Sequence, residues 1–362
     1  MNFFPSRALA IYVGRTFLWR CLAMLAMLVM VLQILDLLSE AGNVLSYPGN
    51  GDAELWRYVG LRMPVIISTF LPFSVLLGTL VTLTTLNANS EVISMKAGGL
   101  SAHQILAPLM LVSLGVAVVS FAFNERVVVR AASTLTAWEK VHFGPIPRAQ
   151  GTKANVWVRD GDDLVRAGLI SGTGANVVLT DVSLYDRHGD RLVTVIHAPS
   201  GRYAGKGWDL KNATAFDVAH GTSRSLGNIH IGDSIRPDQF TLSSVDPEGM
   251  SFWQLKDAIK VLRASGRPVA GLEGSLWHKI TEPLSSLLMP LLGSVAAFGI
   301  ARSGKLFVRA VIGMALGFTF FVVDNFALSM GSLGVYPPIL SAWAPFLLFF
   351  LVGEAVLVTT EE

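Results

Sequence analysis

The feature that most constrains the fold of this 362-residue chain is a series of six long apolar stretches that carry almost no charge. A helix needs about 20 mostly apolar residues to cross the hydrocarbon core of a bilayer, and within that core only helices and closed barrels satisfy their backbone hydrogen bonds. The six stretches are residues 16–38, 62–86, 104–123, 275–300, 308–330 and 338–359. They predict a polytopic α-helical membrane protein with six transmembrane helices, three on each side of one polar insert.

Composition and charge agree with this class of protein. Charged residues make up 15% of the chain, whereas soluble domains carry about 25%. The first apolar stretch is too long for a signal peptide and no small-residue cleavage site follows it, so we expect a retained transmembrane helix. The net charge of +2 gives no reason to expect a nucleic acid as partner.

Basic residues predict the orientation in the membrane. Arginines precede the first stretch, and basic residues fill the short link between the fourth and fifth, with no acidic residue among either group. These residues are Arg7, Arg15 and Arg20 before or at the start of the first stretch, and Arg302, Lys305 and Arg309 in the link or at its end. Short loops rich in Lys and Arg stay in the cytoplasm. We therefore expect both termini in the cytoplasm and the polar insert in the periplasm.

The polar insert, residues 125–270, has the size of one small domain and the pattern of antiparallel β structure. Short runs of Val, Ile, Leu, Tyr and Trp alternate with polar residues, as in strands with one buried face. Asp160-Gly161 and His188-Gly189 are typical hairpin turns. The pattern fits either a sandwich or an open roll, and we expect a β-jellyroll-like domain.

A short helix should end the insert, at residues 251–265. Ser251 and Gln254 have the spacing of a capping box, and Gly266 followed by Pro268 should stop the helix. The apolar stripe of this helix would consist of Leu255, Ile259 and Leu262. The chain then divides into residues 1–124, 125–270 and 271–362, with three transmembrane helices in the first part and three in the last.

Signatures of catalysis are absent from the sequence. It contains no H-E-x-x-H, G-x-S-x-G or G-x-x-x-x-G-K-[ST] pattern, and GRYAGKG at Gly201 is better explained as a β-turn. The seven histidines lack metal-ligand spacing, and the single cysteine, Cys21, is expected to be an inert packing residue. We expect a non-catalytic chain that binds no metal or cofactor, with any nucleotide site on another protein.

The polar connection between the second and third stretches, "NSEVISMKAGG", is unusual for a turn between two spans. Ser90 is a plausible helix start, Glu91 is an acid in the first turn, and Gly98-Gly99 is a plausible stop. They predict a short cytoplasmic helix at about residues 88–98. Such a helix can dock in a groove on a soluble partner, or it can be an interfacial turn whose polar residues meet water.

These stretches together resemble the LptF/LptG family of lipopolysaccharide export permeases. The resemblance is carried by "NSEVISMKAGGLSAHQI", "LDLLSEAGN", "LPFSVLLGTL", "VWVRDGDDLVRA", "LRASGRPVAGLEGSLWHKITEPLS" and "MALGFTFFVVDNF", in this order along nearly the whole chain. "LRASG" and "FVVDN" favour the LptG branch over the LptF branch.

The resemblance implies a half-transporter of the bacterial inner membrane. It would pair with an LptF-like paralogous permease and an LptB-like ATPase dimer, which holds ATP and Mg. Lipopolysaccharide would pass through the periplasmic β domain to an LptC-like protein. The short helix would be the coupling helix that docks in the ATPase. Its candidate residues are Ser90, Glu91, Met95, Lys96 and Gly98.

The resemblance and the cost of polar groups in a membrane suggest three further sets of residues. Candidate contacts to lipid phosphates are Arg57, Arg62, Arg126 and Arg130; cavity candidates are Met24, Met27, Phe70 and Phe73; gate or helix-packing candidates are Asp36, Gly313, Gly317 and Asp324. The alternatives are interfacial anchors, ordinary lipid-facing residues and internal hydrogen bonds respectively. The chain departs from the family at the outer end of the first span, where Gln33, Ser39 and Glu40 stand in place of lysines.

Other functions remain open from the sequence. The chain could be an LptF-type paralogue or the permease of another lipid-extracting ABC system. From a different class, it could be a membrane-anchored scaffold that presents its β domain to periplasmic partners. A scaffold needs no coupling helix, so a charge reversal at Glu91 should leave a scaffold unaffected and should impair an exporter.

Overall fold

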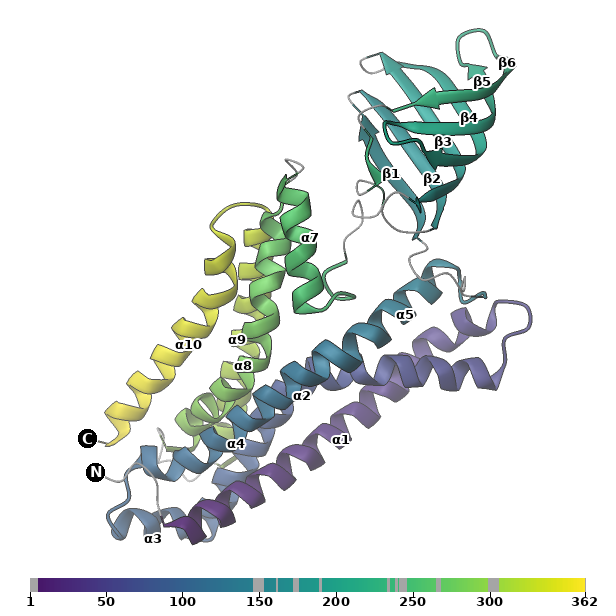
Figure 1. Cartoon of the computed structure of the whole chain (residues 1–362). Helices are drawn as coiled ribbons and strands as arrows, with labels where there is room; N and C mark the ends of the chain where they lie inside the picture. Colours follow the sequence, from purple (N-terminus) through teal and green to yellow (C-terminus); the bar gives the residue numbers. More distant parts are fainter. Residues whose placement is uncertain are drawn as a thin grey trace. The chain divides into compact units, whose positions relative to one another are not determined.

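The computed structural model describes residues 6–145, 153–160, 162–171, 176–188, 191–232, 235–237, 240, 246–264, 268–298 and 306–361. The chain forms two compact units (Figure 1). One comprises residues 1–142 and 247–362 and is helical; the other, residues 143–246, is a β unit.

The helical unit contains several long helices joined by shorter helical segments. They are α1 (Arg7–Leu45), α2 (Asp52–Ala88), α3 (Glu91–Ala97), α4 (Ala102–Phe123), the π-helical turn η1 (Asn124–Val128), α5 (Val129–Lys140), α7 (Phe252–Ala264), α8 (Ala270–Phe298), α9 (Leu306–Ser332) and α10 (Pro338–Glu361). Within this unit the start of α1, the end of α10 and α3 lie at the same end (Figure 1).

Five helices of the described chain are long and apolar enough to cross a membrane. They are Arg7–Leu45, Asp52–Ala88, Ala102–Lys140, Val311–Ser332 and Pro338–Thr359. The prediction of a helical, membrane-spanning chain is thereby confirmed.

The fourth predicted span forms α8, which is 29 residues long but is not among these five. Its first half carries Glu273, Lys279 and Glu282, which lower its hydropathy. The rest of α8 packs against α2, α4, α9 and α10, so Leu288 and Leu292 are fully buried within the chain. Because protein rather than lipid surrounds it, α8 tolerates polar residues.

Several helices run beyond the apolar stretches that predicted them. The helix α2 begins at Asp52 rather than near residue 62, so Arg57 and Arg62 lie inside it. The helix α4 passes through η1 into α5 and ends at Lys140. Leu135 and Trp138 of α5 are buried, which keeps this segment in the helical unit.

The β unit therefore begins after and ends before the predicted boundaries, residues 125 and 270.

The capping box of α7 is confirmed: the backbone N–H of Gln254 donates to Ser251 Oγ at 3.2 Å, and that of Ser251 to Gln254 Oε1 at 3.0 Å. The predicted stripe of α7, Leu255, Ile259 and Leu262, is buried. Glu125 of η1 accepts a hydrogen bond from the N–H of Phe252, and Arg263 pairs with Glu273. These contacts hold α7 on the helical unit.

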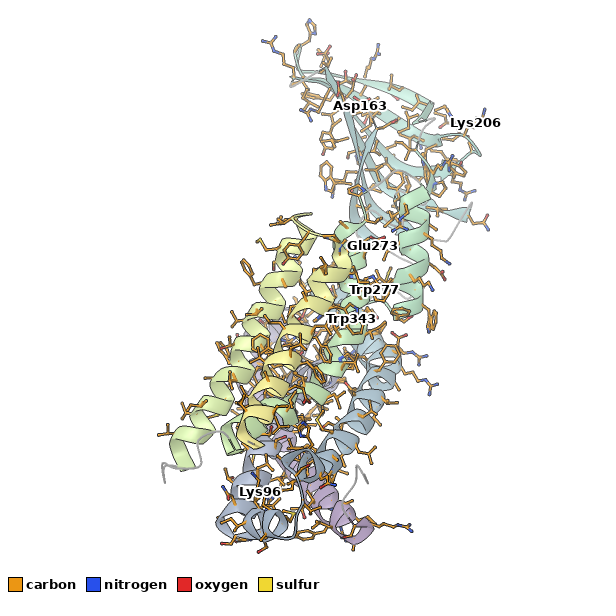
Figure 2. All side chains as sticks on the ribbon, turned by 90° about the vertical axis from the view of Figure 1, so that its left-hand side faces the viewer. Lys96, Asp163, Lys206, Glu273, Trp277 and Trp343 are labelled. Atoms are coloured by element: carbon orange, nitrogen blue, oxygen red, sulfur yellow. The ribbon has the colours of Figure 1, made fainter. Side chains whose placement is uncertain are left out.

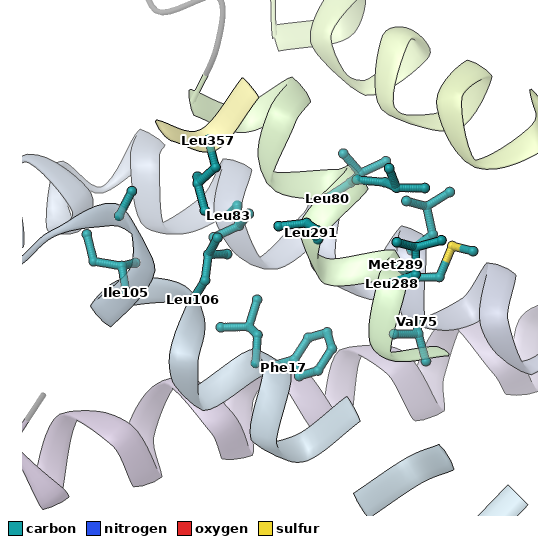
Figure 3. Close-up of a cluster of buried hydrophobic side chains, with 14 of the residues drawn as sticks. Phe17, Val75, Leu80, Leu83, Ile105, Leu106, Leu288, Met289, Leu291 and Leu357 are labelled. Atoms are coloured by element: carbon teal, nitrogen blue, oxygen red, sulfur yellow. The ribbon is translucent and has the colours of Figure 1, made fainter. Parts of the chain in front are cut away.

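The core of the helical unit brings together residues from both halves of the sequence. Phe17, Leu83, Leu106, Leu291 and Leu357 belong to one buried cluster (Figure 3). Close helix approach depends on small residues in two places. A side chain at Gly78 would collide with the buried Cys21, and one at Gly317 would collide with Leu76.

The β unit is one antiparallel sheet in which neighbours in sequence are neighbours in space. Its strands, in the order β1-β2-β3-β4-β5-β6, are β1 (Lys153–Asp160), β2 (Asp163–Ser171), β3 (Val178–His188), β4 (Arg191–Tyr203), β5 (Trp208–Asp217) and β6 (Thr222–Ile231). The antiparallel prediction is confirmed. Among the described strands no crossover connection occurs, so they form an open roll rather than two stacked sheets.

The predicted turns of the β unit lie where the strands reverse. Asp160 pairs with Asp163, and His188 pairs with Arg191, so hairpins close at both predicted positions. The GRYAGKG segment joins β4 to β5, with the N–H of Ala204 donating to the carbonyl of Gly207 at 3.1 Å. It is a turn, as predicted.

Candidate functional site

The short helix α3 forms between α2 and α4, as predicted, but its start differs from the predicted cap. Ser90 is in the left-handed region, with φ of 59°, and its hydroxyl does not cap the helix. The side-chain amide of Asn89 instead donates to Glu91 Oε1 at 3.2 Å. The predicted stop is confirmed: Gly99 has φ of 86°, and the N–H of Leu100 donates to the carbonyl of Met95.

The two faces of α3 differ in character. Val92 is buried and Met95 packs against the core of the helical unit, so one face is anchored. On the other face Lys96 and Gly98 are exposed, Glu91 is half-buried and Ile93 is 63% exposed. Figure 2 shows Lys96 at the end of the helical unit opposite Glu273. The helix therefore presents a mixed polar and apolar face, and Ile93 is a residue that sequence reasoning missed.

The base of α3 is tied to the C-terminal helix. Ser101 and Gln104 form a capping box that starts α4 directly after α3. His103 Nε2 lies 3.2 Å from Glu354 Oε2 of α10. Leu357 of α10 is buried in the same core against which Val92 and Met95 of α3 pack. The core therefore connects α3 to the end of α10.

A polar network joins α1 and α2 near their other ends. Asp36 accepts hydrogen bonds from the hydroxyl of Tyr58 at 2.7 Å and from Nε of Arg62 at 3.0 Å. Arg57 lies over the ring of Trp138, 4.8 Å from its centroid. Arg62 and Arg57, both proposed from the sequence as phosphate contacts, thus already have partners within the chain, and Asp36 fixes helix packing.

Arg126 and Arg130 are placed differently. Both are exposed, one on η1 and the other on α5. Within the described part of the chain, neither side chain forms a hydrogen bond or an ion pair. Of the four arginines predicted to contact phosphate, these two have guanidinium groups directed to the surroundings.

The other gate and packing candidates are buried inside the chain. Asp324 is 6% exposed, and its Oδ2 lies 3.8 Å from Nδ1 of His278 on α8. Gly313 and Gly317 are buried, and Gly317 faces Leu76 of α2. The exposed face of α9 is formed by different residues, namely Met314, Phe318, Val322 and Phe326.

The four cavity candidates also separate. Phe73 stacks on Phe321 with ring centroids 4.0 Å apart, and Phe70 lies 5.9 Å from Phe73, so these rings belong to the contact between α2 and α9. Met24 is half-buried, and Met27 is 63% exposed on α1. The structure does not gather the four into one site.

No group of three or more His, Cys, Asp or Glu side chains that could hold a metal ion occurs within the described ranges.

The helices and strands described above define a multi-pass membrane protein in which a β unit is inserted between helices. The family model described as "Lipopolysaccharide export system permease LptF/LptG" matches residues 11–359. The chain belongs to this family.

Individual relatives agree over almost the full length. The chain is 26% identical over 360 residues to the lipopolysaccharide export system permease protein LptG of Escherichia coli K12, covering 96% of this chain and 97% of that protein. It is 28% identical over 356 residues to LptG of Haemophilus influenzae, covering 94% and 95%. The resemblance to this family, and the preference for its LptG branch, are confirmed.

Proposed function

We propose that this chain is the LptG-like permease subunit of an ATP-driven exporter in the bacterial inner membrane. It extracts lipopolysaccharide and passes it through the periplasmic β unit toward the outer membrane. The full-length family match carries the proposal, and the relatives' names supply the cargo. The chain itself is non-catalytic: ATP and Mg bind to a separate LptB-like ATPase dimer, and an LptF-like paralogue and an LptC-like protein complete the path.

The helix α3 is the coupling element in this proposal. One face is fixed to the core by Val92 and Met95, and the other exposes Ile93 and Lys96. An anchored helix with an exposed apolar side chain suits a groove on a soluble partner, because motion of the partner is then passed to the transmembrane helices. The basic segments near α1 and between α8 and α9 support a cytoplasmic location for this end.

Two other surfaces support a lipid cargo. Arg126 and Arg130 are exposed beyond the apolar part of α4 and suit phosphate groups, which arginine binds with paired donors. The β unit has an apolar inner face, which includes Val182 and Ile196, suited to acyl chains. Neither surface is explained by a protein that acts only as a membrane anchor.

The test is charge reversal on α3. The Glu91→Lys variant is expressed in the native membrane and purified in mild detergent, and co-purifying ATPase and lipopolysaccharide release are measured. Asp52→Lys is the matched control, because Asp52 is also an acid in the first turn of a helix, and reversal costs both helices a similar dipole interaction. We expect that only the Glu91→Lys variant loses the co-purifying ATPase and the release of lipopolysaccharide.

Normal ATPase recovery and release in Glu91→Lys would remove the coupling role of α3. If wild-type chain recovered no ATPase at all, the scaffold function would replace the exporter.

A further inference from the structure

The inner face of the β unit breaks the alternation expected of a strand. Side chains of a regular strand point inward at every second residue. In five of the six strands one step along the inner face is three residues instead of two. The steps are Ala167 to Ile170 in β2, Leu179 to Val182 in β3, Ala198 to Gly201 in β4, Leu210 to Ala213 in β5 and Leu226 to Ile229 in β6. Each of these five strands therefore carries one extra residue between two inward-facing ones.

The extra residues lie at the same level of the sheet. The pairs Ala167↔Val182 and Leu169↔Thr180 place Gly168 opposite Asp181. The register places Asp181 opposite Pro199 and Pro199 opposite Asn212 in the same way. The line continues to Asn155 of β1 and Asn228 of β6. We call this line the crease; it consists of Asn155, Gly168, Asp181, Pro199, Asn212 and Asn228.

Every residue of the crease is a type that strands disfavour, and the backbone explains the choice. Asp181 and Asn212 have φ of 57° and 53°, and Gly227 has φ of 70°. Asp and Asn tolerate this left-handed region better than other residues with a side chain. A side chain at Gly168 would lie 2.5 Å from Asp181 Oδ2, so glycine makes room for Asp181.

A bulge that adds a residue to only one strand shifts its register against the neighbouring strand. From β1 to β5 the register is constant across the crease, because the interrupted positions lie opposite one another. The strands therefore change the direction of their side chains together, along one line. The ladder is also weakest along this line: the register shifts between Leu210 and Ala213, and proline has no N–H to donate at position 199.

The crease separates two halves with different linings. On one side large side chains fill the inner face, and Trp208 is held there by a hydrogen bond from Nε1 to the carbonyl of Ile235 at 3.0 Å. Phe240 packs edge-on against Trp208, with centroids 5.2 Å apart. On the other side the inward positions next to the crease are small, namely Ala167, Val182, Ala198 and Ala213, and Val165, Leu184 and Ile196 lie farther along. One half therefore has a core of large aromatic residues, and the other has a lining of smaller aliphatic ones.

On the outer face, ion pairs tie the crease to one of the two halves. Asp181 Oδ2 lies 3.6 Å from Nη1 of Arg166, and Oδ1 lies 3.7 Å from Nδ1 of His197. Both partners belong to the half with small residues, and all three side chains are one-third to one-half exposed. Exposed pairs of this kind contribute little energy, so they can open without a large cost.

We propose that the crease is a hinge across the sheet. The half with the smaller inner residues turns about it relative to the half filled by Trp208, and the space over its apolar inner face widens when a lipid with several acyl chains enters. This inference rests on the proposed function, which supplies the apolar cargo, but the hinge itself is built from positions that the export function does not explain.

The test measures distance across the crease by pulsed electron paramagnetic resonance. In the full complex with Cys21→Ala, spin labels are placed on exposed β4 sites on either side, Val193→Cys and Arg202→Cys. The control pair, Asp162→Cys and Thr222→Cys, lies on one side of the crease. With a rise of about 3.3 Å per residue, the labels lie about 20 and 10 Å from Pro199 along the strand, so increasing a bend of about 30° by a further 30° shortens the first separation by about 3 Å.

The complex is measured in nanodiscs with and without purified lipopolysaccharide, and lipid release is assayed on the same samples. We expect the β4 pair to shift by this amount on loading while the control pair stays constant. An unchanged β4 distance overturns the hinge, and if release is normal in that sample the exporter still stands. A shift of the β4 pair alone, in a sample that releases no lipid, keeps the hinge and removes the export function.

Discussion

The carboxylate of Asp36 should be a main contributor to the contact between α1 and α2. It accepts hydrogen bonds from Tyr58, which is buried, and from Arg62, whose side chain is 36% exposed. Hydrogen bonds to charged groups contribute about 1.5–3 kcal/mol each, against about 0.5–1.5 for neutral ones. Asp36→Asn keeps the shape but loses the charge, so each bond weakens by about 1 kcal/mol. Discounting the partly exposed arginine, we expect a loss of about 1.5–2 kcal/mol.

The assay is reversible unfolding in mixed detergent micelles, followed by circular dichroism. The matched control is Glu40→Gln on the same helix, because Glu40 accepts an exposed hydrogen bond from Asn43, one turn away; this variant should change stability by less than about 0.5 kcal/mol. A double-mutant cycle of Asp36→Asn with Tyr58→Phe should give a coupling of about 1 kcal/mol. Equal effects of Asp36→Asn and Glu40→Gln, with no coupling to Tyr58, would refute this reasoning.

Three further predictions concern packing, buried polarity and cargo. Gly317→Val should destabilise the chain by about 1–3 kcal/mol, because its side chain meets Leu76; adding Leu76→Ala should recover part of the loss in the same unfolding assay. Gln33→Met should stabilise the chain by about 1 kcal/mol, since neither amide atom of Gln33 has a hydrogen-bond partner among the described residues; a lower midpoint would contradict this. Replacing Arg126 and Arg130 together by Gln should weaken lipopolysaccharide binding about tenfold at low salt and less at high salt, as measured by scintillation proximity; a salt-independent loss would argue against phosphate contacts.

Patterns that repeat locally were sufficient to predict much of the fold. Apolar runs located the membrane helices because hydrocarbon imposes a length and a composition that few other structures share. The capping box at Ser251 and the stop at Gly99 were also predictable, since each depends on neighbours within a few residues. The hairpins after Asp160 and His188 follow the same rule.

Features that depend on distant partners were not predictable. Nothing in the local sequence shows that Arg62 pairs with Asp36, 26 residues away, or that Gly317 faces Leu76 rather than another chain. The extension of α4 to Lys140 was missed because polarity rises after Phe123 while the helix continues. The charge of an exposed arginine and that of a paired one look the same in a sequence, so the candidate phosphate contacts separated only in the structure.

The crease was also not predictable, because it is formed by residues that are distant in the sequence. Asp181 and Asn212 each look like an ordinary irregularity in a β-rich segment. Their alignment with Gly168 and Pro199 becomes visible only when the register of the sheet is known. The sequence therefore contains all the residues of the crease, but it does not show that they lie next to one another in the sheet.

The central claim is that this chain passes lipopolysaccharide along the inner face of its β unit in an ATP-dependent step. The most direct measurement places a photo-crosslinking amino acid at Ile196, which packs against the inner core, and at Thr214, which is exposed on the outer face. The labelled chain is reconstituted in proteoliposomes with its ATPase, its paralogue and lipopolysaccharide. An adduct with lipopolysaccharide at Ile196 that forms only with ATP, and none at Thr214, is the expected result. Equal adducts at both sites, or an adduct at Ile196 that forms equally without ATP, would contradict the account.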